Sequence, residues 1–137
     1  MRRDLLFVDT AGWMALVDAA DPDHERAGAA RDQWLGNGGL LATSDYVADE
    51  TLTLLRVRMG LRVAELWWQQ VEASSRLRWE WVDPGRAERA RAWFFRWSDK
   101  DFSFTDCTSF VIMKELRIKR ALTLDRHFSQ AGFEPLP

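Results

Sequence analysis

The stretch Leu5-Leu6-Phe7-Val8-Asp9-Thr10 decides how the rest of the chain is interpreted. Its four consecutive large apolar residues predict a short strand buried on both faces, as in a parallel sheet covered by helices. The strand ends at the carboxylate of Asp9, which is costly to bury without a partner. Two interpretations are open at this point. Asp9 either caps a helix that begins near Ala11, or belongs to a ligand site at the carboxyl end of the strand.

Length and composition predict one domain over residues 1–137, with the apolar and charged content of a soluble globular protein. No apolar run approaches the roughly 20 residues that span a bilayer, so we expect no membrane association. The apolar stretch after Arg2-Arg3 is too short for a signal peptide. The single cysteine, Cys107, cannot form an intramolecular disulfide and fits a reducing cytoplasm, where we expect it to be a small buried hydrophobe.

Net charge and aromatic content indicate which kinds of partner the protein could bind. A net charge of −2 argues against a broad electrostatic grip on nucleic acid, although acids gathered in one pocket would leave a mildly basic shell around it. Tryptophan and phenylalanine are abundant, and runs such as Trp67-Trp68 and Trp93-Phe94-Phe95 exceed what one core face of a helix can hold. They indicate either an interface between protein chains or an unusually large core.

Strands and helices alternate along the chain, which predicts an α/β sandwich with a central, mainly parallel sheet. A strand is expected at 77–82. Apolar and charged residues alternate along it, so it should lie at an edge of the sheet or have one solvated face. The further strands expected are 40–43 and 121–124, with a short one near 133. The helices expected are 11–20, 24–35, 46–59, 61–73, 85–97, 107–116 and 126–130.

Three further acids share the conflict between charge and apolar surroundings seen at Asp9. Glu50 interrupts an apolar stripe of its helix, formed by Tyr46, Val47, Leu54 and Val57; ion pairing with an arginine is the structural alternative. Asp106 follows Ser103 in a capping pattern, and Asp125 follows the strand 121–124 as Asp9 follows the first.

These acids can share one crevice, because strand ends and the starts of the following helices meet at one edge of a parallel sheet. Converging carboxylates raise one another's pKa values unless a cation lies among them. Oxygen ligands alone favour Mg²⁺ or Mn²⁺ over zinc. Such clusters commonly hold two metal ions that promote an in-line phosphoryl displacement. The residues therefore predict metal-dependent phosphate chemistry.

Four stretches together resemble the PIN domain, and more narrowly the small VapC-type ribonuclease toxins of toxin–antitoxin pairs, over essentially the whole chain. No single motif carries the resemblance; the ordered set of four acids does. The stretches are Leu5-Leu6-Phe7-Val8-Asp9-Thr10, Asp45-Tyr46-Val47-Ala48-Asp49-Glu50, Ser103-Phe104-Thr105-Asp106 and Thr123-Leu124-Asp125-Arg126-His127-Phe128.

The resemblance implies a three-layer sandwich and a Mg²⁺- or Mn²⁺-dependent endoribonuclease that hydrolyses RNA phosphodiester bonds. It also implies a homodimer and a cognate small antitoxin whose tail enters the acidic cleft. Asp9 and Asp106 would be the principal metal ligands, Glu50 would be a ligand or orient the attacking water, and Asp125 would complete the catalytic pocket. The remaining candidates are Thr10 and Thr123, as hydrogen-bond partners of the carboxylates or substrate, and Arg126, Arg120 and Lys119, as contacts to RNA phosphates.

Alternatives remain at this stage. A phosphatase of the haloacid-dehalogenase type would need an aspartate at Ala11, and a receiver domain would need an acidic neighbour beside Asp9. The segment Cys107-Thr108-Ser109 is more polar than the corresponding helix of many PIN relatives. This difference weakens a detailed analogy to the substrates of those relatives, but not the analogy to their chemistry. The rivals left open are an inactive PIN-like module that binds RNA or protein, and a PIN nuclease of RNA processing with no toxin role.

Overall fold

The computed structural model describes residues 3–137, so Met1 and Arg2, the first half of the basic pair, lie outside the described residues. Within the described chain, the centre is a five-stranded sheet in the order β3-β2-β1-β4-β5, and all neighbouring strands are parallel. This confirms the predicted parallel sheet, with β3 at an edge. The strands are β1 (Leu5–Val8), β2 (Leu40–Ser44), β3 (Leu77–Glu80), β4 (Arg120–Leu122) and β5 (Glu134–Leu136).

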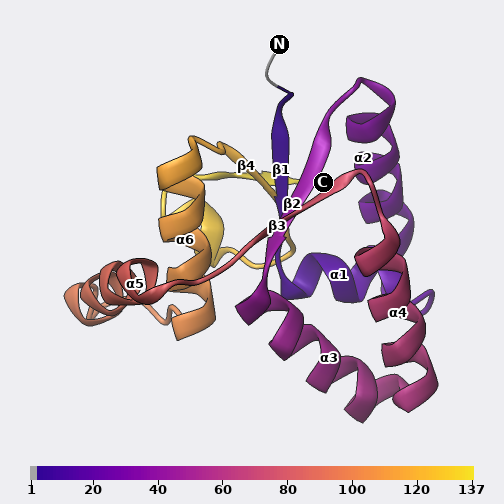
Figure 1. Cartoon of the computed structure of the whole chain (residues 1–137), viewed down its shortest axis with the longest axis horizontal. Helices are drawn as coiled ribbons and strands as arrows, with labels where there is room; N and C mark the ends of the chain where they lie inside the picture. Colours follow the sequence, from indigo (N-terminus) through magenta and orange to yellow (C-terminus); the bar gives the residue numbers. More distant parts are fainter. Residues whose placement is uncertain (1–2) are drawn as a thin grey trace.

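Helices cover both sides of the sheet, which gives the three layers expected. Figure 1 shows α1, α2 and α4 on one side and α5 and α6 on the other, with α3 below the end at which β1 and β2 finish. There α3 contacts α1, α4 and α6, so it closes this end of the molecule. The helices are α1 (Thr10–Val17), α2 (His24–Gly36), α3 (Asp45–Met59), α4 (Leu61–Ala73), α5 (Pro84–Arg96), α6 (Phe104–Leu116) and α7 (His127–Gln130).

Two predicted strand ends differ from the structure. The strand predicted to reach residue 124 ends at Leu122, because the Thr123 hydroxyl accepts the N–H of Asp125 at 2.9 Å and turns the chain. The strand predicted to reach Val82 ends at Glu80, since the Val82 N–H donates to Asp45 Oδ1 at 2.9 Å. Asp125 therefore lies in a turn beyond β4, whereas Asp9 directly follows β1. The other boundaries lie within one turn of those predicted.

The core lies between β1 and the two helix layers. Residues 6–8 of β1 are fully buried, which confirms the strand buried on both faces. On the α6 side, the ring of Phe110 is the centre of an aromatic cluster, with centroids of Phe102, Phe128 and Phe133 at 5.0, 5.0 and 5.7 Å. Because Phe102 precedes α6 and Phe128 lies in α7, this packing fixes both segments that flank the site described below.

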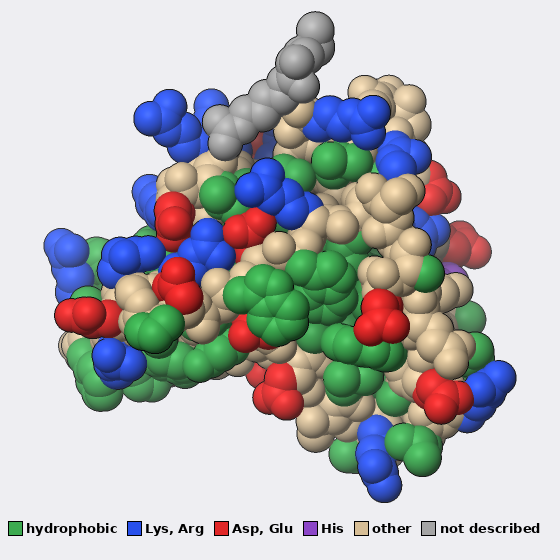
Figure 2. Space-filling model, viewed as in Figure 1, with side chains coloured by type: hydrophobic (Ala, Val, Ile, Leu, Met, Phe, Trp, Pro, Cys, Tyr) green, Lys and Arg blue, Asp and Glu red, His purple; other side chains and the backbone are tan. Residues whose placement is uncertain are grey.

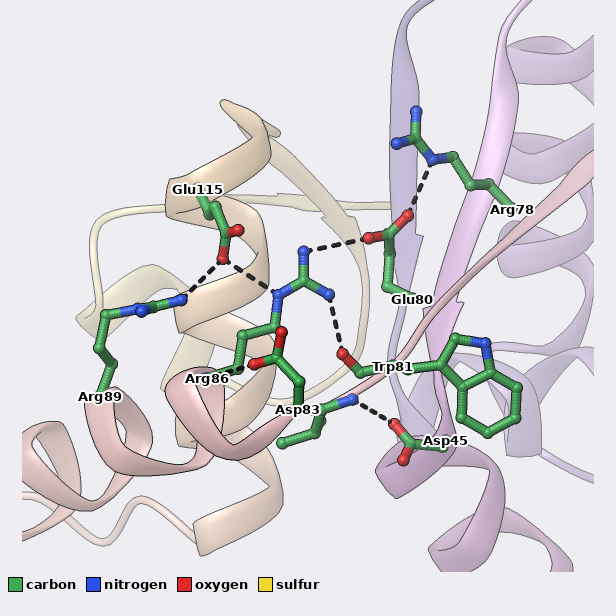
Figure 3. Close-up of polar contacts among 9 residues, drawn as sticks. Asp45, Arg78, Glu80, Trp81, Asp83, Arg86, Arg89 and Glu115 are labelled. Atoms are coloured by element: carbon green, nitrogen blue, oxygen red, sulfur yellow. Dashed lines mark hydrogen bonds and ion pairs between the residues drawn. The ribbon is translucent and has the colours of Figure 1, made fainter.

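A buried arginine anchors α5, the helix that projects at the left of Figure 1. Arg86 Nη2 lies 3.1 Å from Glu80 Oε1, Nε lies 3.0 Å from Glu115 Oε2, and Nη1 donates to the Trp81 carbonyl at 3.0 Å (Figure 3). Arg89 adds an exposed contact to Glu115 at 3.1 Å. These bonds join α5 to the edge strand β3 and to α6, which begins with one of the candidate ligands.

The aromatic residues divide between core and surface. Trp67 is buried. In contrast, Trp68, Trp79 and Trp81 form a row with centroid distances of 5.6 and 6.3 Å, and Trp81 is 64% exposed. On α5, Phe95 is 76% exposed. Figure 2 shows apolar side chains in the middle of this face, over β3, and along α5. Along the part of the chain that the structure describes, no helix combines the length and apolarity needed to cross a bilayer.

Candidate metal centre

Asp9 is buried and is held by two hydrogen bonds. It directly follows β1 and caps α1, because its Oδ1 accepts the N–H of Gly12 at 2.7 Å. Its Oδ2 accepts the hydroxyl of Thr123 at 2.7 Å. The side chain is buried, and burial raises the pKa of Asp9 from 3.8 to about 7, against the lowering effect of these two hydrogen bonds. The negative charges of Asp106 and Asp125 raise this pKa further. Capping and a place in a carboxylate cluster are therefore both true of Asp9.

Asp106 reaches the same region from the first turn of α6. It completes the predicted capping box: Ser103 Oγ accepts the N–H of Asp106 at 2.9 Å, and Asp106 Oδ2 accepts the N–H of Ser103 at 3.0 Å. Burial and the nearby charge of Asp125 raise the pKa of Asp106. The adjoining Cys107 is buried as predicted, and burial raises its pKa to about 12, so it remains an inert thiol.

The turn after β4 supplies the third acid. Asp125 Oδ1 accepts the N–H of His127 at 2.9 Å, an Asx turn that fixes the carboxylate. Thr123 links this turn to Asp9, since its Oγ1 accepts the Asp125 N–H and donates to Asp9. The prediction that Thr123 contacts a carboxylate agrees with this geometry.

His127 was not among the residues singled out from the sequence. Its Nδ1 lies 2.9 Å from Asp106 Oδ2 and 3.1 Å from Asp125 Oδ2. One ligand atom of each of these three residues lies within 4.8 Å of the others. The sequence holds one signal that could have indicated it, a histidine two positions after a candidate acid, where an Asx turn returns the side chain toward that acid.

A cavity of about 260 Å³ opens beside these groups. Glu50 lies in its wall with Val47 and Leu54, so α3 presents the carboxylate to the cavity as predicted. Val57, which was predicted on the same apolar stripe, is 77% exposed because the last turn of α3 extends past the core. The lining, including residues not predicted, is Asp9, Thr10, Ala11, Met14, Asp21, Val47, Glu50, Leu54, Arg58, Thr105, Asp106, Ser109, Leu124 and Asp125.

Thr10 also lines this cavity. It is buried, and its Oγ1 has no hydrogen-bond partner within residues 3–137. A buried hydroxyl without a partner carries a free-energy cost that a ligand in the cavity would remove.

The three predicted RNA-contacting residues lie at opposite ends of the sheet. Arg126 is exposed beside Asp125. Lys119 and Arg120 lie at the start of β4, opposite the strand end that leads to the acids, and Arg120 Nε pairs with Glu134 at 3.0 Å. Lys119 and Arg120 are close to Asp125 in sequence, but β4 separates them from the acids in the fold.

The residues present fit a divalent cation. The donors that face the cavity are carboxylate and hydroxyl oxygens, which suit Mg²⁺ or Mn²⁺. In the part of the chain that the structure describes, no arginine or lysine forms an ion pair with Asp9, Glu50, Asp106 or Asp125; their one basic partner is His127. A buried carboxylate with a raised pKa and no cationic partner is the group that a metal ion would stabilise in its ionised form.

Known proteins resemble this chain over nearly its whole length. The family model described as the PIN domain matches residues 6–134. The 23S rRNA-specific endonuclease VapC20 of Mycobacterium tuberculosis is 37% identical over 129 residues, which cover 94% of this chain and 95% of the relative. Ribonuclease VapC26 of the same organism is 28% identical over 127 residues, 90% of both chains.

Solved structures extend the comparison. The crystal structure of Mycobacterium tuberculosis VapC20, described as a sarcin–ricin loop cleaving toxin, superposes with a TM-score of 0.84 at 36% identity, covering 93% of this chain and 95% of that one. FitAcB from Neisseria gonorrhoeae gives a TM-score of 0.67 at 14% identity over 96% of both chains, a likeness of fold alone.

Proposed function

Because the chain belongs to the PIN domain family, we propose that it is a metal-dependent endoribonuclease and the toxin of a toxin–antitoxin pair. The observation that carries the proposal is the convergence of carboxylates from four separate segments on one cavity, with Asp9 buried and without a basic partner within the described residues. Groups whose pKa is strongly raised and that line a cavity are typical of functional sites, which supports an active enzyme over an inactive binding module.

In this proposal Asp9 and Asp106 hold Mg²⁺ or Mn²⁺, Glu50 binds the ion or orients the attacking water, and Asp125 completes the pocket. A bound divalent cation would activate water and stabilise the charge that develops on the phosphate oxygens. Thr123 holds the Asp9 carboxylate in place through its 2.7 Å hydrogen bond. The unpartnered hydroxyl of Thr10 is then available to a phosphate oxygen in the cavity.

Positive charge at the rim would help to bind the RNA backbone. Arg58 lines the cavity and is exposed at the end of α3, and Arg126 is exposed beside Asp125. Arginine suits this role because its guanidinium makes paired hydrogen bonds to phosphate. Such contacts position the RNA without selecting its sequence, so we assign binding strength and not specificity to these two residues.

The relatives supply the substrate class. The protein that is 37% identical is named for 23S rRNA, and its solved structure for cleavage of the sarcin–ricin loop. We therefore propose a structured loop of ribosomal RNA as the substrate. The toxin role further implies a small antitoxin protein, a homodimer and a cytoplasmic location. The exposed Trp81, stacked on the half-buried Trp79, supports an interface between protein chains.

The decisive experiment is cleavage of intact ribosomes, purified 23S rRNA, transfer RNA and an unstructured messenger RNA by the purified protein, with primer extension to locate each cut. We expect cleavage of 23S rRNA at one loop with Mn²⁺ or Mg²⁺, and none with EDTA or with Asp9→Asn. Glu50→Gln should also abolish cleavage, while Asp49→Asn, a matched change at an exposed site on the same helix, should not.

Three results would each change the assignment. RNA binding without cleavage by the wild type would support the inactive module. Cleavage that persists in EDTA and in Asp9→Asn would contradict the metal mechanism. Cleavage of many RNAs, with no growth arrest on expression and no adjoining antitoxin gene that relieves it, would support a nuclease of RNA processing in place of a toxin.

A further inference from the structure

His127 connects carboxylates that come from different parts of the chain. The turn between β4 and α7 forms one continuous hydrogen-bonded path. Thr123 Oγ1 donates to Asp9 Oδ2 at 2.7 Å and accepts the Asp125 N–H at 2.9 Å. Asp125 Oδ1 then accepts the His127 N–H at 2.9 Å, and the His127 ring reaches across to Asp106. Two candidate metal ligands, Asp9 and Asp106, are thus joined through this one turn.

The imidazole ring is fixed in orientation. Its Nδ1 lies between Asp106 Oδ2, at 2.9 Å, and Asp125 Oδ2, at 3.1 Å. A bound cation would keep both carboxylates ionised, and ionised carboxylates only accept hydrogen bonds; Nδ1 then carries the hydrogen and donates it to Asp106 Oδ2, with Asp125 Oδ2 beside it. The Phe102 ring packs edge-to-face on the imidazole at 5.8 Å, and the next residue, Phe128, is fully buried. The ring therefore cannot turn away without disturbing the aromatic core.

This arrangement distinguishes the two oxygens of Asp106. Oδ2 accepts the N–H of Ser103 at 3.0 Å and the Nδ1–H of His127 at 2.9 Å. Oδ1 accepts no hydrogen bond from the residues that the structure describes. With two donors on one oxygen, the carboxylate plane is set, and the other oxygen keeps its lone pairs for a cation.

We propose that His127 is a positioning residue of the metal centre: its Nδ1–H holds Oδ2 of Asp106 close to Asp125 and leaves Oδ1 of Asp106 as the ligand oxygen. The inference rests on the proposed metal-dependent function but concerns how the site is built. It also excludes metal ligation through Nδ1. A ring nitrogen that donates its hydrogen to Asp106 has no lone pair for a metal ion.

The test compares Mn²⁺ affinity among variants, measured from the electron paramagnetic resonance signal of free Mn²⁺, so that no cleavage is needed. In His127→Asn the amide nitrogen can take the place of Nδ1 and donate to Asp106. In His127→Gln the amide lies one methylene further out, near the place of Nε2. We expect His127→Ala and His127→Gln to weaken Mn²⁺ binding by about 10-fold to 100-fold, and His127→Asn to recover most of that loss.

The other histidine of the chain provides the matched control. His24 Nδ1 contacts the Ala15 carbonyl at 2.7 Å, outside the carboxylate cluster, so His24→Asn should leave the Mn²⁺ affinity unchanged. Thermal melting of every variant in EDTA separates loss of fold from loss of positioning. If His127→Ala does not fold, the Asn and Gln variants, which differ by one methylene, still carry the comparison.

Three results would overturn the proposal: unchanged Mn²⁺ affinity in His127→Ala, equal weakening in folded Asn and Gln variants, or coupling of bound Mn²⁺ to an imidazole nitrogen in pulsed resonance spectra of the wild type. The last would make His127 a ligand. If the wild type binds Mn²⁺ but cleaves no RNA, the proposed nuclease function fails while the order of affinities still decides the role of His127.

Discussion

Replacing Asp9 with asparagine should stabilise the metal-free protein, although it should abolish metal binding. Burial raises the pKa of Asp9 from 3.8 to about 7 in the folded chain. This difference is worth about 4 kcal/mol of folding free energy, at about 1.4 kcal/mol for each tenfold change in the ionisation constant. Because the folded pKa is the higher one, the contribution is fully present below pH 3.8 and is lost as the pH rises to about 7. Asparagine does not titrate and avoids that loss.

Part of the gain will be offset locally. Thr123 donates to Asp9 Oδ2, and an amide nitrogen at that place would leave the hydroxyl hydrogen without its acceptor, at a cost of about 1 kcal/mol. At pH 8 the free energy of unfolding of Asp9→Asn should thus exceed that of the wild type by about 3 kcal/mol. The comparison of the two proteins at each pH removes the titration of groups that they share.

The measurement is urea unfolding in EDTA, followed by tryptophan fluorescence, at several values between pH 4 and pH 8. Asp9→Asn should gain on the wild type as the pH rises, and the gain should level off above pH 7. Asp49→Asn, at an exposed site, should show no such trend. Excess Mn²⁺ should reverse the order, because ligand at about 1,000 times its dissociation constant stabilises the wild type alone by about 4.1 kcal/mol. Parallel pH curves for Asp9→Asn and the wild type would refute this account of the buried carboxylate.

Three further predictions follow from the packing and charges. Gly12→Ala should lower the free energy of unfolding by about 3 kcal/mol, because its β-carbon would overlap a carbonyl oxygen of β4. Gly28→Ala should be neutral or stabilising in the same urea titration, because its β-carbon would make only an ordinary contact, 3.8 Å from the end of the Arg31 side chain in α2. Arg86→Met should destabilise the fold by about 3 kcal/mol in chemical denaturation, since it removes a partner of the buried Glu80. At limiting metal, cleavage should fall about tenfold per pH unit below pH 7, because Asp9 must lose its proton to bind a cation; an unchanged rate at pH 6 would contradict this.

The meeting of Asp9, Glu50 and Asp106 was predictable because it depends on topology alone. A short apolar strand indicates a parallel sheet, and parallel strands finish at one edge. Helix α3 also starts at this edge, and its buried face points toward the first turns of the neighbouring helices. Glu50 lies on that face and therefore lines the cavity. None of these inferences requires knowledge of a side-chain torsion or a turn, which is why sequence patterns were sufficient.

The contacts that depend on a single turn were not predictable in the same way. The position of His127 follows from two hydrogen bonds in the Thr123–His127 turn, and residue spacing does not specify them. Lys119 and Arg120 are close to Asp125 in sequence but not in space, since a strand rises about 3.3 Å per residue and β4 separates them from the acids. The division of aromatic residues between core and surface likewise depends on tertiary packing, as Trp67 and Trp81 show.

The hydrogen bond between Thr123 and Asp9 joins residues 114 positions apart, and this separation affects when the protein can act during its synthesis. A ribosome that has translated three quarters of the chain has already released the first strand and its aspartate. At that stage β1 still lacks β4, its neighbour in the sheet, and the turn that orients two of the acids has not been made. Contacts so distant in sequence form late. The proposed metal site can therefore be completed only after the Thr123–His127 turn has been synthesised and β4 has paired with β1.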